Sequence, residues 1–225
     1  MNEATLGFNW RHTDTLLLDM DGTLLDLAFD NYFWHELVPQ ALASHRQLSH
    51  DRAVQIVADN SHRVRGQLQW YCLDHWTEQL GLDVHALKHA HRHRIGFLPG
   101  VIQFLRRARD LGRRIIIATN AHPRTLEVKL RQTRLDLFVD EVVSSHAYGY
   151  PKETAQFWAM LHQQVRFDPA RCCFFDDSHS ILAAARKHAG LPTVAIRRPD
   201  STAARADVGS HDAIDGLGDL ITQML

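Results

Sequence analysis

Five short, continuous apolar segments are the clearest pattern in this chain, and each is followed by polar residues. They span residues 15–18, 114–118, 139–143, 171–175 and 192–196. Apolar runs of this length, without alternating polar positions, are typical of strands that are covered on both faces, as in a parallel sheet. The pattern therefore predicts five buried strands in one parallel sheet.

Helical patterns separate these strands from Phe97 onward. Apolar side chains three or four positions apart form stripes that begin at Val101, Leu126, Phe157 and Ile181. Pro123 suits the first turn of the second helix, and Gly112 suits the end of the first. Strands that alternate with helices through short connections predict a doubly wound α/β fold with a Rossmann-like sheet. The tail after Pro199 is predicted to end in a short helix over residues 217–225.

Residues 26–95 interrupt this alternation, and no strand pattern stands out among them. Apolar positions in this interval follow a helical spacing, as at Trp34, Leu37, Val38, Ala41 and Leu42. Roughly seventy residues are too many for a loop and enough for a small helical bundle. We therefore predict a core domain of residues 1–25 and 96–225, and a helical cap domain of residues 26–95 that covers the site as a lid.

The composition is that of an ordinary globular protein without a dominant charge. The 225 residues are 45% hydrophobic and 23% charged, and the formal net charge is −1. Such a chain has no positive field that would attract nucleic acid or an acidic membrane surface. We therefore expect a small-molecule substrate whose charge is handled locally, and no nucleic-acid or membrane partner. The oligomeric state is left open.

Cysteine usage and the longest apolar runs bear on the compartment. Cys72, Cys172 and Cys173 are odd in number and two are adjacent, which does not resemble a disulfide framework and fits a reducing compartment. The N-terminal segment lacks a charged start followed by an apolar stretch, so no signal peptide is predicted. Apolar runs such as residues 115–118 are far too short to span a bilayer. We expect a cytoplasmic protein.

Histidine occurs sixteen times, and its densest group consists of His85, His89, His91 and His93. Three of these follow one another at intervals of four, which would place them on one helical face, where they could bind a soft metal ion. The alternative is a solvated helix face, since Lys88, Arg92 and Arg94 are interspersed. We prefer this alternative, because nothing nearby supplies the helix-held acid and base of a zinc enzyme.

The first predicted strand leads directly into two carboxylates, Asp19 and Asp21, followed by Gly22. Residues i and i+2 of an extended chain project to the same side, so the two acids converge. Asp19 is placed to attack the phosphorus of a phosphate ester. Asp21 is placed to protonate the leaving alkoxide and later to deprotonate the attacking water. Gly22 permits the sharp turn that follows.

Such a pair needs positive charge beside it, because an anionic nucleophile and an anionic phosphate repel each other. Asp177, after the fourth strand, supplies a carboxylate suited to Mg²⁺, which prefers hard oxygen ligands. Lys152 supplies an ammonium group, and Asp176 is placed to pair with it and orient it. Thr119 and Asn120 follow the second strand with a hydroxyl and an amide that can donate to phosphate oxygens.

Each of these features also has a purely structural interpretation. Asp176-Asp177 before the helix at Ile181, and Thr119-Asn120 before Pro123, are good helix-capping sequences. Their joint occurrence, in order and each at its own strand end, favours a single phosphoryl-transfer site.

The chain resembles the haloacid dehalogenase (HAD) superfamily in four motifs, namely Asp19-Met20-Asp21-Gly22-Thr23, Thr119-Asn120, Lys152 and Asp176-Asp177. The helical insertion follows the first motif, where the family's C1 cap belongs. The resemblance implies that Asp19 is the nucleophile, that Asp21 is the acid and base, and that Thr119 and Lys152 bind phosphate. It also implies Mg²⁺ held by Asp19, Asp177 and the backbone carbonyl of Asp21. Dehalogenases lack the second acid and the metal, so Asp21 favours a phosphatase.

Further segments are similar to the bacterial GMP/IMP nucleotidase group of this superfamily, at residues 17–34, 70–74, 78–83, 119–123 and 148–153. This similarity implies a 5′-nucleotidase acting on purine nucleoside monophosphates. Asn31 and Tyr32, close behind the first motif, are expected to face the site and bind the substrate, and aromatic cap residues such as Trp34 and Trp70 can stack on a purine. The alternative is that these aromatic residues form the cap's own core.

Three other functions stay open. The chain could be a capped phosphatase of a small metabolite such as phosphoglycolate, a sugar-phosphate mutase with the same aspartyl-phosphate, or an inactive binding module. The intact Asp19, Asp21, Lys152 and Asp177 argue against the last. His122 either touches the substrate or caps the helix that starts next to it.

Overall fold

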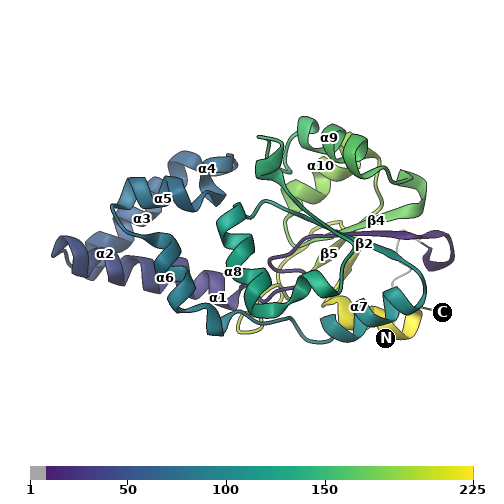
Figure 1. The fold of residues 1–225 in the computed structure, drawn as a ribbon, viewed down its shortest axis with the longest axis horizontal. Helices are drawn as coiled ribbons and strands as arrows, with labels where there is room; N and C mark the ends of the chain where they lie inside the picture. Colours follow the sequence, from purple (N-terminus) through teal and green to yellow (C-terminus); the bar gives the residue numbers. More distant parts are fainter. Residues whose placement is uncertain (1–8, 225) are drawn as a thin grey trace.

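A parallel sheet of six strands forms the centre of the protein (Figure 1). The structure is a computed structural model, and it describes residues 9–224. The strand order is β3-β2-β1-β4-β5-β6. The strands are β1 (Thr15–Leu18), β2 (Arg114–Thr119), β3 (Glu141–Ser144), β4 (Cys172–Asp176), β5 (Thr193–Ile196) and β6 (Ala213–Ile214). The predicted doubly wound α/β fold is confirmed.

The predicted strands differ from the observed ones mainly at their ends. β3 begins at Glu141 instead of residue 139 and extends to Ser144, because Ser144 still pairs with Thr119 of β2. β6 was not predicted, since its two residues are too few to produce a pattern, and it is recruited to the sheet by pairing with β5.

Helices cover both faces of the sheet, which explains the continuous apolar runs. Leu17 of β1 packs with the helices α9 (Ala155–Val165) and α10 (His179–Ala189) on one face. Its neighbours Leu16 and Leu18 pack on the other face with α7 (Val101–Asp110) and α8 (Pro123–Thr133). Figure 1 shows α9 and α10 above the sheet and α7 below it. Pro123 is the first residue of α8, as predicted.

Short 3₁₀ turns complete the core at η1 (Trp10–His12), η4 (Leu135–Leu137), η5 (Ser145–Ala147), η6 (Pro169–Arg171) and η7 (Leu217–Gln223). The predicted C-terminal helix is therefore the 3₁₀ segment η7, which packs on α7. Residues 1–8, where no signal-peptide pattern was found, and residue 225, the end of the predicted helix, lie outside the described residues. Among residues 9–224, no helix is long and apolar enough to cross a membrane.

The interval between β1 and α7 is helical, as its spacing predicts. It contains α1 (Leu27–Tyr32), a π-helical segment η2 (Phe33–Leu37), α2 (Val38–Arg46), α3 (His50–Val64), α4 (Leu68–Tyr71), α5 (Leu73–Leu80), α6 (Val84–Ala90) and a 3₁₀ turn η3 (Arg92–Arg94). These helices gather at one end of the molecule, beside α8 (Figure 1). We keep the name cap for residues 26–95, and the division between cap and core at these residues stays a prediction.

The chain enters and leaves the cap at one place. Residues 24–26 and 96–98 run antiparallel, with an isolated bridge between Leu25 and Phe97. The N–H of Asp26 donates to the carbonyl oxygen of Gly96 (3.0 Å), and the N–H of Leu98 donates to that of Leu24 (3.0 Å). We call this pair of segments the double linker. It holds the start of the cap close to the turn that carries Asp21.

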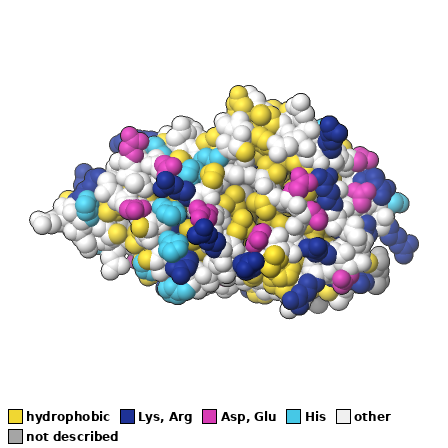
Figure 2. All heavy atoms as spheres, in the orientation of Figure 1, with side chains coloured by type: hydrophobic (Ala, Val, Ile, Leu, Met, Phe, Trp, Pro, Cys, Tyr) yellow, Lys and Arg dark blue, Asp and Glu magenta, His cyan; other side chains and the backbone are white. Residues whose placement is uncertain are grey.

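The histidine-rich region corrects one prediction. Helix α6 ends at Ala90, where the Nδ1 atom of the capping residue His91 lies 2.9 Å from the carbonyl oxygen of Leu87. His93 falls in the following 3₁₀ turn, so the expected single helical face of His85, His89 and His93 does not form. Figure 2 shows histidines spread over the cap among acidic and basic side chains.

Candidate active site

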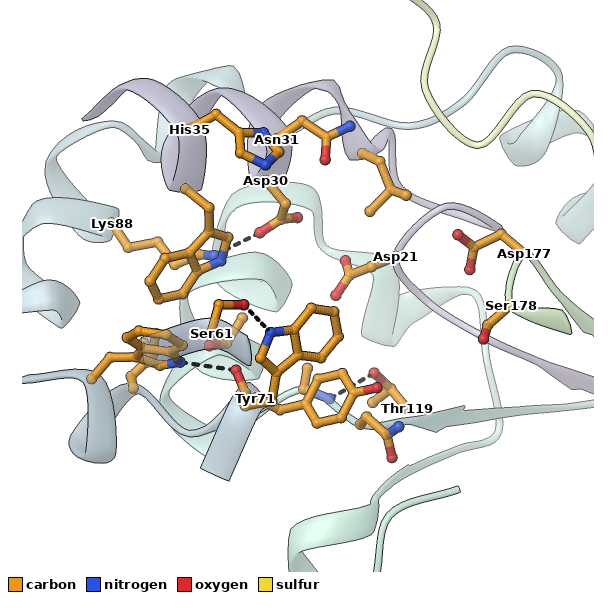
Figure 3. Close-up of a pocket in the computed structure, with 18 of the residues that line it drawn as sticks. Asp21, Asp30, Asn31, His35, Ser61, Tyr71, Lys88, Thr119, Asp177 and Ser178 are labelled. Atoms are coloured by element: carbon orange, nitrogen blue, oxygen red, sulfur yellow. Dashed lines mark hydrogen bonds and ion pairs between the residues drawn. The ribbon is translucent and has the colours of Figure 1, made fainter. Parts of the chain in front are cut away.

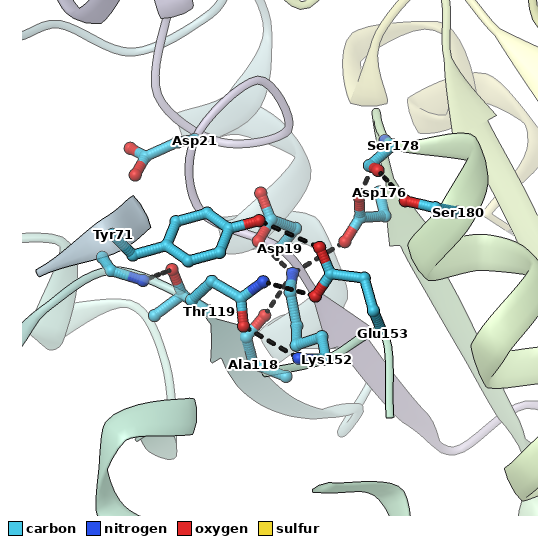
Figure 4. Close-up of polar contacts among 12 residues, drawn as sticks. Asp19, Asp21, Tyr71, Ala118, Thr119, Lys152, Glu153, Asp176, Ser178 and Ser180 are labelled. Atoms are coloured by element: carbon cyan, nitrogen blue, oxygen red, sulfur yellow. Dashed lines mark hydrogen bonds and ion pairs between the residues drawn. The ribbon is translucent and has the colours of Figure 1, made fainter. Parts of the chain in front are cut away.

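Strand β1 delivers Asp19 to the carboxyl edge of the sheet. The N–H of Asp19 donates to the carbonyl oxygen of Phe175 on β4 (2.9 Å), so strand pairing fixes its position. The side chain is buried and forms an ion pair with the ammonium of Lys152 (Figure 4). Burial raises the pKa of Asp19 to about 6, although Lys152 opposes this effect. The site therefore holds a buried carboxylate whose negative charge is only partly compensated.

Lys152 uses all three donors of its ammonium group. Besides the bond to Asp19, Nζ donates to Oδ2 of Asp176 (2.7 Å) and to the carbonyl oxygen of Ala118 (3.0 Å). Burial alone would lower the pKa of Lys152, but Asp176 and Asp19 raise it above its usual value. The ammonium is thus charged and fixed in direction, which suits a group that binds an anionic phosphate. The pairing of Lys152 with Asp176 agrees with the prediction from the sequence.

Asn120 holds the segment that carries Lys152. Its Oδ1 accepts from the backbone N–H of Lys152 (2.9 Å), and its Nδ2 donates to Oε2 of Glu153 (3.1 Å). The indole N–H of Trp158 donates to the carbonyl oxygen of Lys152 (2.7 Å). From the cap, the hydroxyl of Tyr71 donates to Oε1 of Glu153 (3.0 Å; Figure 4). Asn120 therefore positions the lysine, a function that its place beside Thr119 did not reveal.

Thr119 is the last residue of β2 and is buried. Its Oγ1 accepts from the backbone N–H of Ala121 (3.0 Å; Figure 4), which leaves the hydroxyl hydrogen able to donate to a phosphate oxygen. The residue lines the same cavity as Asp19 and Lys152.

Three carboxylates could together bind a metal ion. Within residues 9–224 they are the one cluster of at least three Asp, Glu, His or Cys side chains that lie close enough for this. Asp19, Asp176 and Asp177 each offer an oxygen, and these atoms lie within 4.8 Å of one another. Burial raises the pKa of Asp177 well above its usual value, and the neighbouring carboxylates of Asp176 and Asp19 raise it further. Hard oxygen ligands crowded around one ammonium fit a divalent cation such as Mg²⁺, which would relieve their repulsion.

Asp21 lines the same cavity, and its side chain is held by a residue that the sequence did not reveal. Nζ of Lys129, on α8, is 2.5 Å from Oδ1 of Asp21 and 2.6 Å from Oδ2 of Asp30. Burial raises the pKa of Asp21 to about 6, against the opposing effect of Lys129. Burial alone would also raise the pKa of Asp30. The ammonium groups of Lys129 and Lys88 outweigh this effect and keep the pKa of Asp30 below its usual range.

A cavity of about 710 Å³ lies between the core and the cap (Figure 3). Its core side contains all the predicted core-domain site residues, namely Asp19, Asp21, Thr119, Asn120, Lys152, Asp176 and Asp177. Its cap side is aromatic and includes Trp34, Trp70, Tyr71 and Trp76. These side chains also contact one another: the rings of Trp34 and Trp76 are 5.0 Å apart, and those of Trp70 and Tyr71 are 4.9 Å apart. The aromatic residues thus both pack the cap and line the cavity.

The two predicted cap ligands lie in different surroundings. Asn31 lines the cavity, but its Nδ2 donates to Oδ2 of Asp200 in the core (2.6 Å). Tyr32 is not among the residues that line the cavity, and its ring lies 3.9 Å from the guanidinium carbon of Arg94. Of the two, Asn31 is thus at the cavity and Tyr32 is not.

His122 lies at the junction of core and cap, outside the cavity lining. It precedes α8 but its side chain makes no capping hydrogen bond. Its Nε2 is 3.7 Å from Oδ2 of the cap residue Asp74, and its ring packs edge-on against His146 with centroids 4.9 Å apart. His122 thus neither caps α8 nor lines the cavity, and its side chain instead contacts the cap at Asp74.

The fold and the site define a hydrolase with a carboxylate at the end of its first strand. The chain belongs to the haloacid dehalogenase-like hydrolase family, which matches residues 13–189. Over 216 residues it is 39% identical to the GMP/IMP nucleotidase YrfG of Escherichia coli K12, covering 96% of this chain and 97% of that protein. The Shigella flexneri protein of the same name gives the same values. The family resemblance inferred from the four motifs is confirmed.

Solved structures agree with this assignment at the level of the fold. A HAD phosphatase from Thermococcus onnurineus superposes with a TM-score of 0.76 at 22% identity, covering 94% of this chain and 98% of that one. The L-2-haloacid dehalogenase from Xanthobacter autotrophicus gives a TM-score of 0.64 at 17% identity, covering 93% and 97%. The sheet and the inserted helices therefore form a known family architecture.

Proposed function

We propose that this chain is a magnesium-dependent phosphomonoester hydrolase that forms an aspartyl-phosphate on Asp19. One observation carries the proposal: the ammonium of Lys152 joins the carboxylates of Asp19 and Asp176, and Asp177 offers an oxygen within 4.8 Å of both, on the same cavity wall. This arrangement surrounds a nucleophile with the charges that phosphoryl transfer requires.

The chain's own residues account for the bond changes. A carboxylate oxygen of Asp19 forms a bond to phosphorus, and the bond between phosphorus and the ester oxygen breaks. Asp21 donates its proton to that oxygen, which leaves as an alcohol. Asp21 then takes a proton from water as the water attacks the phosphorus, which releases inorganic phosphate and restores Asp19. The hydroxyl of Thr119 and the positive charge of Lys152 stabilise the oxygens of the transferred group.

Asp19, Asp177 and the backbone carbonyl of Asp21 would hold the metal ion. Bound Mg²⁺ would supply positive charge beside the nucleophile and the phosphate. Asp176 is already engaged by Lys152 Nζ (2.7 Å) and by the N–H of Ser178 (2.8 Å), which leaves Asp177 freer to coordinate.

We further propose a 5′-nucleotidase that acts on purine nucleoside monophosphates such as GMP and IMP. The identity of 39% to proteins named GMP/IMP nucleotidase supports this substrate class. The cavity supports it as well, because about 710 Å³ is within the range of small-molecule sites and aromatic side chains of the cap line the same cavity as the predicted phosphate site. Aromatic side chains stack on bases through their π-faces.

A panel of phosphate esters tests both parts of the proposal. We expect IMP and GMP to have higher kcat/KM than phosphoglycolate or hexose phosphates, with release of inorganic phosphate. Higher kcat/KM for phosphoglycolate would support the small-metabolite phosphatase instead, and phosphate transfer between sugar hydroxyls would support the mutase. Asp19→Asn, purified in parallel, controls for contaminating phosphatases.

A further inference from the structure

Four side chains of alternating charge form a continuous chain in the wall of the cavity. The carboxylate of Asp21 contacts the ammonium of Lys129 (2.5 Å), which contacts Asp30 (2.6 Å), which in turn contacts Lys88 (2.6 Å). The exposed fractions of the two lysine side chains are only 1% and 2%. Figure 3 shows Asp21, Asp30 and Lys88 among the residues that line the pocket. Two buried lysines in one network are unusual, because a lysine is rarely fully buried unless it is paired.

The four residues come from both parts of the molecule. Asp21 follows β1 and Lys129 lies on α8, so both belong to the core. Asp30 lies on α1 and Lys88 on α6, so both belong to the cap. The ammonium of Lys129 therefore sits between the acid at the cavity and a carboxylate of the cap. Lys88 is itself held against the ring of Phe33, with 4.6 Å between Nζ and the ring centroid.

Lys129 fixes the direction of the Asp21 side chain. Within the described part of the chain, Lys129 Nζ is the hydrogen-bond partner of the Asp21 carboxylate. A carboxylate without this bond could rotate about its side-chain torsions. Proton transfer needs the acid within hydrogen-bond reach of the departing oxygen, and an error of about 1 Å can reduce the rate by about 100-fold.

We infer that Lys129 is a positioning residue that aims Asp21 at the departing oxygen, and that Asp30 holds Lys129 in place from the cap. The inference rests on the proposed function, since it assigns Lys129 to the proton transfer by Asp21. Contact between cap and core is then part of the catalytic geometry.

Two esters with different leaving groups test the inference. IMP releases an alkoxide that needs a proton, whereas p-nitrophenyl phosphate releases a stable phenolate that does not. The measured quantity is the ratio of kcat/KM for IMP to kcat/KM for p-nitrophenyl phosphate, determined on one preparation. This ratio does not depend on the fraction of folded protein, and it excludes the later hydrolysis of the aspartyl-phosphate, which both esters share. Lys129→Met and the polar variant Lys129→Gln should each lower the ratio by about tenfold or more.

Two further variants distinguish a wrong acid role for Asp21 from a wrong positioning role for Lys129. Asp21→Asn should lower the ratio at least as much as Lys129→Met, and an unchanged ratio there would refute the acid role within the proposed function. Lys88→Met removes an equally buried lysine that does not touch Asp21, and should leave the ratio within about threefold of wild type. The inference is overturned if the Lys129 variants keep the wild-type ratio, or if Lys88→Met lowers the ratio as much as they do.

Discussion

Gly22 lies directly against the carboxyl group of Asp177. A Cβ atom at residue 22 would be only 2.8 Å from Cγ of Asp177, and the φ angle of Gly22 is +89°. The turn that carries Asp21 is thus packed on the loop that carries a predicted metal ligand. A side chain at this position would disturb both sides of the site together.

Gly22→Ala should therefore lose both stability and activity. The positive φ strains any residue with a Cβ, and we expect a loss of more than about 1 kcal/mol in the free energy of unfolding. Displacement of Asp177 should lower kcat/KM by about tenfold or more. Gly66→Ala is the matched control, because Gly66 has a similar φ of +79° but open space around it. This control should lose stability and keep activity, and equal activity losses in both variants would contradict our account.

Asp19→Asn should abolish turnover without unfolding the protein. The amide is no nucleophile toward phosphorus, so we expect kcat to fall by at least about 1,000-fold. Burial already disfavours the charged carboxylate, and Lys152 keeps its bond to Asp176, so the unfolding midpoint should be equal to or higher than that of wild type. Steady-state kinetics and urea denaturation measure these two effects. Substantial activity in a pure preparation would exclude the covalent route.

Removal of divalent cations should stop activity, and added Mg²⁺ should restore it. Added Mg²⁺ should also raise the thermal unfolding temperature of wild type, because an ion that binds only the folded protein stabilises it. Asp177→Asn should raise the Mg²⁺ concentration needed for half of this stabilisation by about tenfold or more. The unfolding measurement does not depend on turnover. Full activity in excess chelator would refute the assigned metal.

The junction of His146 and His122 should make stability depend on pH. Burial, together with the neighbouring His122, lowers the pKa of His146 from 6.5 to about 4. The unfolded chain therefore binds more protons than the folded one between these values, so His146 causes a loss of stability as pH falls from 6.5 toward 4. His146→Gln, which cannot be protonated, should show a weaker fall in the free energy of unfolding over this range. An identical pH dependence in urea titrations would argue against this role.

The sequence predicted the sheet and the carboxyl-edge residues well, for a physical reason. Strands such as β1 and β4 are buried on both faces, so their apolar runs are unbroken and the polar residues after them stand out. Lys129 and Lys88 could not be recognised in the same way. A lysine on a helix is usually exposed, and only the folded structure shows that carboxylates from distant segments bury these two.

The prediction was also weaker where two neighbouring residues were assigned the same role. Asn31 and Tyr32 were both expected to face the substrate, but of the two only Asn31 lines the cavity, and Tyr32 packs against Arg94. Asn120 was expected to donate to phosphate, yet its amide holds the backbone of Lys152 (2.9 Å), a contact across 32 positions of sequence that no local pattern encodes.

The double linker gives the helical segment two ends that lie side by side. A segment attached in this way can be lengthened, shortened or exchanged for another without any change in the order or spacing of the six strands. Selection for new substrates can therefore act on this module, as long as the first helix of the cap keeps the carboxylate of Asp30 that contacts Lys129. In laboratory engineering, the same arrangement makes residues 25 and 97 the natural points at which to graft a different lid.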